Sequence, residues 1–183
     1  NLFAFPPYLG AEQHRNERMK RIFLGLFLLA HSTLALAQTA ADWRTDYEKS
    51  GGVASPRYEA TLAYLARLSK ASPWISLQSF GVTPQGRDLP LVVVSNDRAF
   101  TPARARKIGK PVVLIQAGIH SGEIDGKDAG LMLLREIAIT KTLASLADHA
   151  IILFMPIFNL DGHERQSRYN RINQDGPEEQ GWR

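Results

Sequence analysis

Two short, continuous runs of apolar residues constrain the fold of this chain more than any other feature of its sequence. They cover residues 111–117 and 150–158, and between them Ile124, Leu131 and Ile137 recur at helical spacing. Continuous apolar runs of this length are typical of strands buried on both faces of a sheet. A strand, a helix and a second strand in this order predict a crossover connection, and therefore an α/β fold.

The residues before the first run predict further elements of the same sheet. They are a helix that begins at Arg57 and stops at Pro73, strands over residues 77–82 and 89–95, a turn over residues 83–87 between those strands, and a solvated connection over residues 96–110. We therefore expect a mixed, largely parallel sheet with helices on both faces. After Asn159 hydrophobicity falls and the polar tail contains no closing element, so the domain is expected to be truncated.

The composition limits the kinds of partner and of stabilisation that are available. With 183 residues, of which 44% are hydrophobic, the chain is long enough for one domain with a buried core. The net charge is only +4, and no basic stripe is interleaved with aromatic residues, so we expect no nucleic-acid partner. The chain has no cysteine, which excludes disulfides and a lipid anchor attached to cysteine.

The N-terminal region has the pattern of an export signal. Met19 is followed by a basic pair, by an apolar run over residues 22–30 and by Ala35-Leu36-Ala37, a small-x-small cleavage motif. The apolar run is too short to span a membrane. We therefore expect residues 1–18 to be a leader upstream of the native start, residues 19–37 to be a signal peptide, and residues 38–183 to form the domain. The mature protein is expected to be periplasmic or secreted, without a stable membrane anchor.

His120 and Glu123 are the candidate metal ligands. They lie between the first buried strand and the following helix, where Gly118 and Gly122 allow the backbone to turn. Zinc binds imidazole nitrogen and carboxylate oxygen, and ligands collect beyond the carboxyl ends of strands in open α/β sheets. The spacing alone is weak evidence, because His14 and Glu17 share it. Glu123 is also compatible with a carboxylate that stabilises a helix start, and His120 with an ordinary loop residue.

Four segments together resemble the zinc carboxypeptidases, the carboxypeptidase A-like metallopeptidases. The segment Gly-Ile-His-Ser-Gly-Glu at 118–123 resembles their metal-binding turn, and Pro-Ile-Phe-Asn-Leu-Asp-Gly at 156–162 resembles their Pro-x-x-Asn-Pro-Asp-Gly segment, with Leu160 in place of proline. Residues 80–89 resemble the family's Gly-x-Ser-x-x-Gly-Arg turn, with Thr83 in place of serine, and residues 58–68 resemble the preceding helix. The resemblance covers roughly residues 42–183.

The resemblance implies a Zn²⁺ ion held by His120, Glu123 and a second, distant histidine, with peptide or protein C-termini as substrates. It also implies that Arg183, in a Trp-Arg pair, stabilises the oxyanion, a role for which Arg171 is a competitor. The third ligand and the general base are not found in this chain. His149 precedes the second buried strand, and His163 matches a family position that is not a ligand, so neither is expected to complete the site.

Two other functions stay open at this point. A zinc-dependent deacylase of N-acyl amino acids begins with a related His-x-x-Glu motif, although such enzymes are usually cytoplasmic and the signal peptide favours the peptidase. A non-catalytic binding protein on the same fold would have lost the metal. The residues that distinguish these alternatives lie downstream of residue 183.

Overall fold

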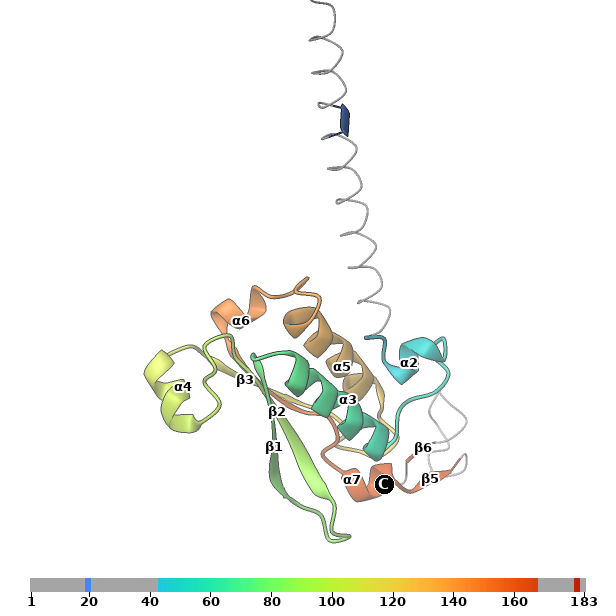
Figure 1. Ribbon diagram of the computed structural model, residues 1–183. Coiled ribbons are helices and arrows are strands. Elements are labelled where there is room, and N and C mark those ends of the chain that lie inside the picture. Colours follow the sequence, from blue (N-terminus) through green and yellow to red (C-terminus); the bar gives the residue numbers. More distant parts are fainter. Residues whose placement is uncertain (1–18, 21–42, 168–179, 182–183) are drawn as a thin grey trace, which may run out of the picture. The chain divides into compact units, whose positions relative to one another are not determined.

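A computed structural model describes residues 19–20, 43–167 and 180–181 of the chain (Figure 1). The chain divides into two units, Asn1–Asp42 and Trp43–Arg183. In the first unit Met19 and Lys20 are helical, and the rest of the predicted signal peptide lies outside the described residues. Among the residues that are described, no helix combines the length and apolar character needed to cross a membrane.

The second unit contains the helices and strands that position the candidate site. In chain order they are α2 (Asp46–Lys49), α3 (Tyr58–Ala71), β1 (Ile75–Val82), β2 (Asp88–Val94), α4 (Pro102–Ile108), β3 (Val112–Gln116), α5 (Asp125–Ala138), α6 (Leu146–His149), β4 (Ile151–Met155), α7 (Leu160–His163), β5 (Gln166–Ser167) and β6 (Gln180–Gly181).

Four strands form a mixed sheet in the order β1-β2-β4-β3. The pairs β1–β2 and β2–β4 are antiparallel, and β3–β4 is parallel. The parallel pair is the one that the strand-helix-strand pattern predicts, because α5 carries the chain back to the start of β4. The expected α/β fold with a mixed sheet is confirmed, and the antiparallel β1 and β2 are joined by the predicted turn.

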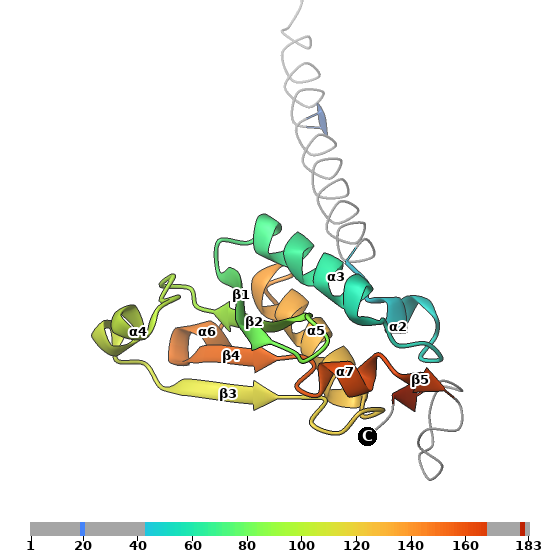
Figure 2. The same cartoon turned by 90° about the horizontal axis from the view of Figure 1, so that it is seen from below.

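Helices lie on both faces of this sheet. On one face α3 and α5 run side by side (Figure 2), and leucines such as Leu65 and Leu131 pack with Val92 and Phe154 in the main core. On the other face Ile108 of α4 packs into a smaller cluster around Val93 and Ile151. Alternate residues of β2 therefore point into two different cores, as a strand covered on both sides requires.

The segment over residues 96–110, expected to be a solvated connection, contains the helix α4. Thr101 caps it, since its hydroxyl accepts a hydrogen bond from the Arg104 amide at 3.2 Å, and Pro102 occupies the first turn. Gly109 ends the helix with a φ of 76°. The segment is a connection between β2 and β3 and its helix has no buried residue, as a solvated connection requires, but the helix itself was not predicted.

Strand β3 is also more exposed than its sequence predicts. Val112, Val113 and Leu114 are 52%, 44% and 52% exposed, so the prediction that this strand is buried on both faces is wrong for the described residues. The reason is its place in the sheet: β3 is an edge strand, which pairs with β4 alone among the described strands. The prediction is confirmed for β4, which lies between β2 and β3.

Helix α5 lies unusually close to the sheet at Gly130. A Cβ atom at this residue would stand 2.1 Å from Cζ of Phe154, whose side chain is only 1% exposed. A second glycine of α5, Gly126, would place a Cβ atom 3.0 Å from that of Ala117 at the end of β3. These two close approaches set the distance between the helix and the strand ends that flank the candidate site.

Candidate metal centre

The loops that follow β3 and β4 lie against each other at one end of the sheet. The parallel pairing continues past the strands through three backbone hydrogen bonds: the Ala117 amide donates to the Met155 carbonyl (2.9 Å), the Phe158 amide to the Ala117 carbonyl (2.9 Å), and the Asn159 amide to the Gly118 carbonyl (2.8 Å). Both segments singled out in the sequence, 118–123 and 156–162, therefore meet at the carboxyl ends of adjacent strands, where α/β folds hold ligands.

Two glycines give the first of these loops its path. Gly118 has a φ of 59° and Gly122 a φ of 82°, both in the left-handed region that favours glycine. A Cβ atom at Gly118 would also stand 3.2 Å from the Cα atom of Ile157 in the neighbouring loop. The glycines that the sequence marked as hinge points are thus required by backbone geometry and, at Gly118, by the close approach of the second loop.

His120 and Glu123 face each other across this turn. The His120 Nδ1 atom lies 2.9 Å from Oε1 and 3.1 Å from Oε2 of Glu123, and the His120 amide donates to Glu123 Oε2 at 3.2 Å. The Glu123 amide donates back to the His120 carbonyl at 3.2 Å. The two side chains are 55% and 38% exposed, so both an ion and a substrate could reach them from solvent. Glu123 also precedes the N-terminus of α5, where a negative charge is favoured.

The chemistry of this pair fits zinc. Two ligands bound at about 2.0–2.1 Å in tetrahedral geometry stand about 3.4 Å apart, so the imidazole nitrogen and the carboxylate oxygen need to separate by only about 0.5 Å to bind one ion. Within residues 19–20, 43–167 and 180–181, no group of three His, Cys, Asp or Glu side chains could hold a metal ion. His120 and Glu123 therefore offer two candidate donors within the described residues, one fewer than the three protein ligands that catalytic zinc sites use.

The other histidines considered from the sequence do not join this pair. His149 ends α6, before β4 begins, at the opposite end of the parallel pair. His163 ends α7, at the same end of the sheet as His120. It is only 3% exposed, however, and both of its ring nitrogens have partners within the protein. That neither histidine is the third ligand stays a prediction. Arg183 and Arg171 lie outside the described residues.

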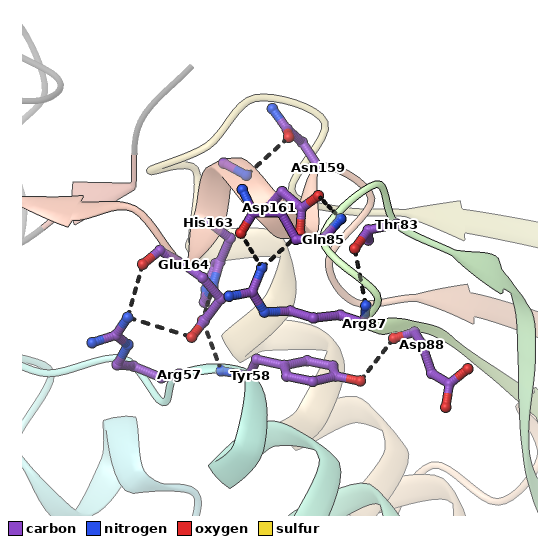
Figure 3. Close-up of polar contacts among 11 residues, drawn as sticks. Arg57, Tyr58, Thr83, Gln85, Arg87, Asp88, Asn159, Asp161, His163 and Glu164 are labelled. Atoms are coloured by element: carbon purple, nitrogen blue, oxygen red, sulfur yellow. Dashed lines mark hydrogen bonds and ion pairs between the residues drawn. The ribbon is translucent and has the colours of Figure 1, made fainter.

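The second loop leads into α7 through the turn expected at Asn159. Its side-chain oxygen accepts a hydrogen bond from the Gly162 amide at 3.2 Å (Figure 3). One residue into the helix, Asp161 forms an ion pair with Arg87 at 2.7 Å and accepts a hydrogen bond from the Gln85 amide at 3.2 Å. The turn between β1 and β2 is thereby fastened to α7.

Charge and hydrogen bonding act together on the Asp161 carboxylate. Burial alone would raise its pKa, but hydrogen bonds from Thr83, Arg87 and the Gln85 amide, together with the positive charge of Arg87, bring the pKa below its ordinary value. Arg87 and Asp161 are 74 positions apart. Both lie in segments that the sequence singled out, but no sequence pattern predicted that the two side chains form an ion pair.

A second cluster of polar side chains, around Glu164, was not predicted from the sequence. Glu164 follows α7, and its carboxylate accepts a hydrogen bond from the amide of Tyr58, the first residue of α3, at 3.0 Å (Figure 3). No described side chain within α3 caps that end. Lys127 of α5 was also missed, although a signal was available: it falls three residues after Ile124 and four before Leu131, within the apolar stripe of the helix.

The comparisons with known proteins concern the family and the fold of the chain. The family model described as zinc carboxypeptidase matches residues 61–181. The chain belongs to the zinc carboxypeptidase family. Carboxypeptidase 2 of Trichophyton rubrum is 28% identical over 130 residues, which is 69% of this chain and 24% of that protein. The chain thus spans about a quarter of the length of this curated relative.

Solved structures of carboxypeptidases are similar to part of the chain. The carboxypeptidase A of Helicoverpa armigera has a TM-score of 0.52 at 24% identity, with 61% of this chain and 26% of that chain covered. A putative carboxypeptidase A of Shewanella denitrificans OS-217 has a TM-score of 0.48 at 28% identity, with 58% and 26% covered. The predicted family is confirmed by the family model, and the predicted fold class by the mixed sheet with its helices and by the likeness to the Helicoverpa armigera structure.

Proposed function

We propose that the intact protein is a zinc-dependent carboxypeptidase, which hydrolyses C-terminal peptide bonds with His120 and Glu123 as two of its metal ligands. The observation that carries the proposal is the His120–Glu123 pair itself: two zinc-type donors 2.9 Å apart, exposed, at the carboxyl end of a strand. Membership of the zinc carboxypeptidase family supports the same conclusion.

The residues of this chain prepare the site for that reaction. When bound, Zn²⁺ would polarise the scissile carbonyl and lower the pKa of a water molecule at the open position. His120 and Glu123 would hold the ion, and both side chains are exposed enough for substrate to approach them. Arg183 would stabilise the negative charge that develops on the carbonyl oxygen. The general base and the third ligand would come from outside the described residues.

We further propose that the protein is exported, because residues 19–37 have the pattern of a signal peptide. A mature N-terminus at Gln38 is the expected result when the protein purified from its native cells is sequenced. A mature protein that retains residues 22–30 would contradict this proposal.

The metal assignment is tested by replacing one ligand. We expect the intact protein to bind one zinc ion per chain and His120→Ala to bind none under the same conditions, as measured by metal analysis after dialysis. His149→Ala is the matched control, because His149 is an exposed histidine at the other end of the parallel pair. Equal zinc content in His120→Ala and the wild type would refute the assignment.

Substrate choice is tested on the same protein. We expect hydrolysis of an N-blocked dipeptide with a free C-terminal carboxylate and no hydrolysis of an N-acetyl amino acid. The reverse preference would identify a deacylase. Zinc binding without hydrolysis of either substrate would indicate a binding protein on the same fold.

A further inference from the structure

Lys127 is among the largest fully buried side chains of the described residues, with 1% exposure. It lies on the first turns of α5, on the stripe that faces the core. An ammonium group costs several kcal/mol to bury unless it is paired and hydrogen-bonded. Burial accordingly lowers the pKa of Lys127 to about 8, so at neutral pH the group is still mostly charged. Such a side chain needs partners, and the structure provides them.

Two acceptors meet the ammonium group inside the protein. Nζ of Lys127 donates to the Pro56 carbonyl and lies 3.0 Å from Nε2 of His163. The first partner is 71 positions away, in the segment before α3, and the second is 36 positions away, on α7. The one side chain therefore joins α5 to two other parts of the fold.

These contacts determine which nitrogen of His163 carries the proton. A charged lysine has only donors, so Nε2 has to accept and the proton of a neutral imidazole has to be on Nδ1. That atom lies 2.9 Å from Oε1 of Glu164, which is an acceptor. Burial is the main cause that lowers the pKa of His163, and the nearby Lys127 charge acts in the same direction. A second positive charge 3.0 Å from Lys127 is thus disfavoured.

Glu164 connects the network to α3. Its carboxylate accepts from the Tyr58 amide at 3.0 Å and lies 3.4 Å from the Arg57 guanidinium, which also donates to the Glu164 carbonyl at 2.8 Å. Burial alone would raise the pKa of Glu164, but the hydrogen bonds from His163 and Tyr58 and the charge of Arg57 lower it to about 2. The negative charge lies where the N-terminus of a 14-residue helix favours it.

The position of the network relative to the candidate metal turn suggests its role. Glu123 stands one helical turn before Lys127, and Asn159, which donates to the Gly118 carbonyl, stands just before α7 and His163. The two site loops are thus joined by backbone hydrogen bonds at the strand ends and by the Lys127–His163 contact behind them.

We propose that Lys127, His163 and Glu164 form a buried positioning network, in which His163 is held as the Nδ1-protonated tautomer and α7 is clamped to the first turns of α5, so that the His120–Glu123 turn keeps its shape. The network does not touch substrate or metal. Its link to zinc rests on the proposed function, whereas its link to the shape of the turn does not.

The first test reads the tautomer. In the intact, metal-free protein with ¹⁵N-labelled histidine, we expect His163 to show Nδ1 at the shift of a protonated ring nitrogen and Nε2 at that of an unprotonated one, throughout the neutral pH range. Lys127→Met removes the donor to Nε2, so the Nε2 resonance should move towards that of an unprotonated nitrogen without a hydrogen bond, while Nδ1 stays protonated through its contact with Glu164. An Nε2-protonated or doubly protonated His163 in the wild type would overturn the proposal.

The second test compares two substitutions at one position. His163→Gln keeps an acceptor for Lys127 and a donor for Glu164, whereas His163→Leu keeps neither. We expect His163→Leu to shift the ring resonances of His120 in the metal-free protein and to weaken zinc binding about tenfold in a competition titration with a chelator. We expect His163→Gln to stay within about twofold of the wild type, and His149→Leu, the exposed control, to change neither measurement.

The outcomes separate the two proposals. If the wild type binds no zinc, the proposed function fails, and the His120 resonances alone decide on the network. If the His120 resonances and the zinc affinity are the same in His163→Leu as in the wild type, the positioning role is refuted. If His163→Leu does not fold, the tautomer measured in the wild type and the behaviour of His163→Gln still decide, because loss of zinc affinity in His163→Gln would contradict the role assigned to these two hydrogen bonds.

Discussion

Gly130→Ala tests whether the close approach of α5 to the sheet is required for stability. The added Cβ atom would stand 2.1, 2.5 and 2.8 Å from three ring carbons of Phe154. Carbon atoms make favourable contact at about 3.5–4.0 Å, so the ring or the helix has to move by about 1.4 Å. Phe154 is 1% exposed and lies in the main core, so the ring has no free space into which it could turn.

Two effects of opposite sign decide the magnitude. Alanine is favoured over glycine within a helix by up to about 1 kcal/mol. Overpacking of a well-packed core costs typically about 1–3 kcal/mol, and occasionally more. A displacement of about 1.4 Å against a buried ring belongs at the upper end of that range of overpacking costs. After the gain in helix propensity is subtracted, we expect Gly130→Ala to lower the free energy of unfolding by about 2 kcal/mol.

The assay is chemical denaturation of the intact protein, followed by far-ultraviolet circular dichroism. Ala129→Gly is the matched control, because Ala129 is an exposed neighbour on the same helix and isolates the helix-propensity effect. Phe154→Leu removes the clashing ring. Its effect on the free energy of unfolding should therefore be more favourable by at least about 1 kcal/mol in Gly130→Ala than in the wild type. A Gly130→Ala protein that is as stable as the wild type, or more stable, would refute the reasoning.

Three further predictions concern the polar contacts and the open edge of the sheet. Asp161→Asn should cost about 1–2 kcal/mol in urea unfolding at pH 7, and the difference from the wild type should shrink below pH about 4, because a carboxylate of lowered pKa stabilises the fold only while it is ionised. Glu164→Gln should lower the free energy of unfolding by roughly 2–3 kcal/mol at pH 7. The pKa of Glu164 is about 2 in the folded protein against an ordinary 4.5, so its stabilising effect is complete above pH 4.5 and is lost as the pH falls towards 2. Unfolding of the variant and the wild type at pH 3 and pH 7 would reveal this dependence. Residues 38–183 alone should fold poorly and should not hydrolyse peptides, because among the described residues β3 leaves an apolar edge uncovered and only two candidate zinc ligands come together. Measurable hydrolysis of an N-blocked dipeptide by this segment would contradict that expectation.

The local features of the fold and of the site could be predicted from the sequence because their causes are local. The parallel β3–β4 pair follows from two apolar runs with an amphipathic helix between them. The turn at His120 follows from Gly118 and Gly122, whose positive φ angles few other residues adopt. The helix α4 could also have been found, since Thr101, Pro102 and Gly109 mark its two ends. The turn and the helix ends each depend on a few neighbouring residues, and the strand pair depends on the pattern within each apolar run and the helix between them.

What only the tertiary structure decided depends on residues that are far apart in the chain. Arg87 and Asp161, 74 positions apart, form an ion pair, and Lys127 reaches Pro56 and His163 on two different segments. The exposure of β3 was likewise decided by strand order. A sequence pattern shows that Lys127 lies on a core-facing stripe, but it does not show which acceptors meet it there. The acceptors come together only when α5, α7 and the segment before α3 pack against one another. The cost of burying the charge of Lys127 is thus offset by groups that distant parts of the chain provide.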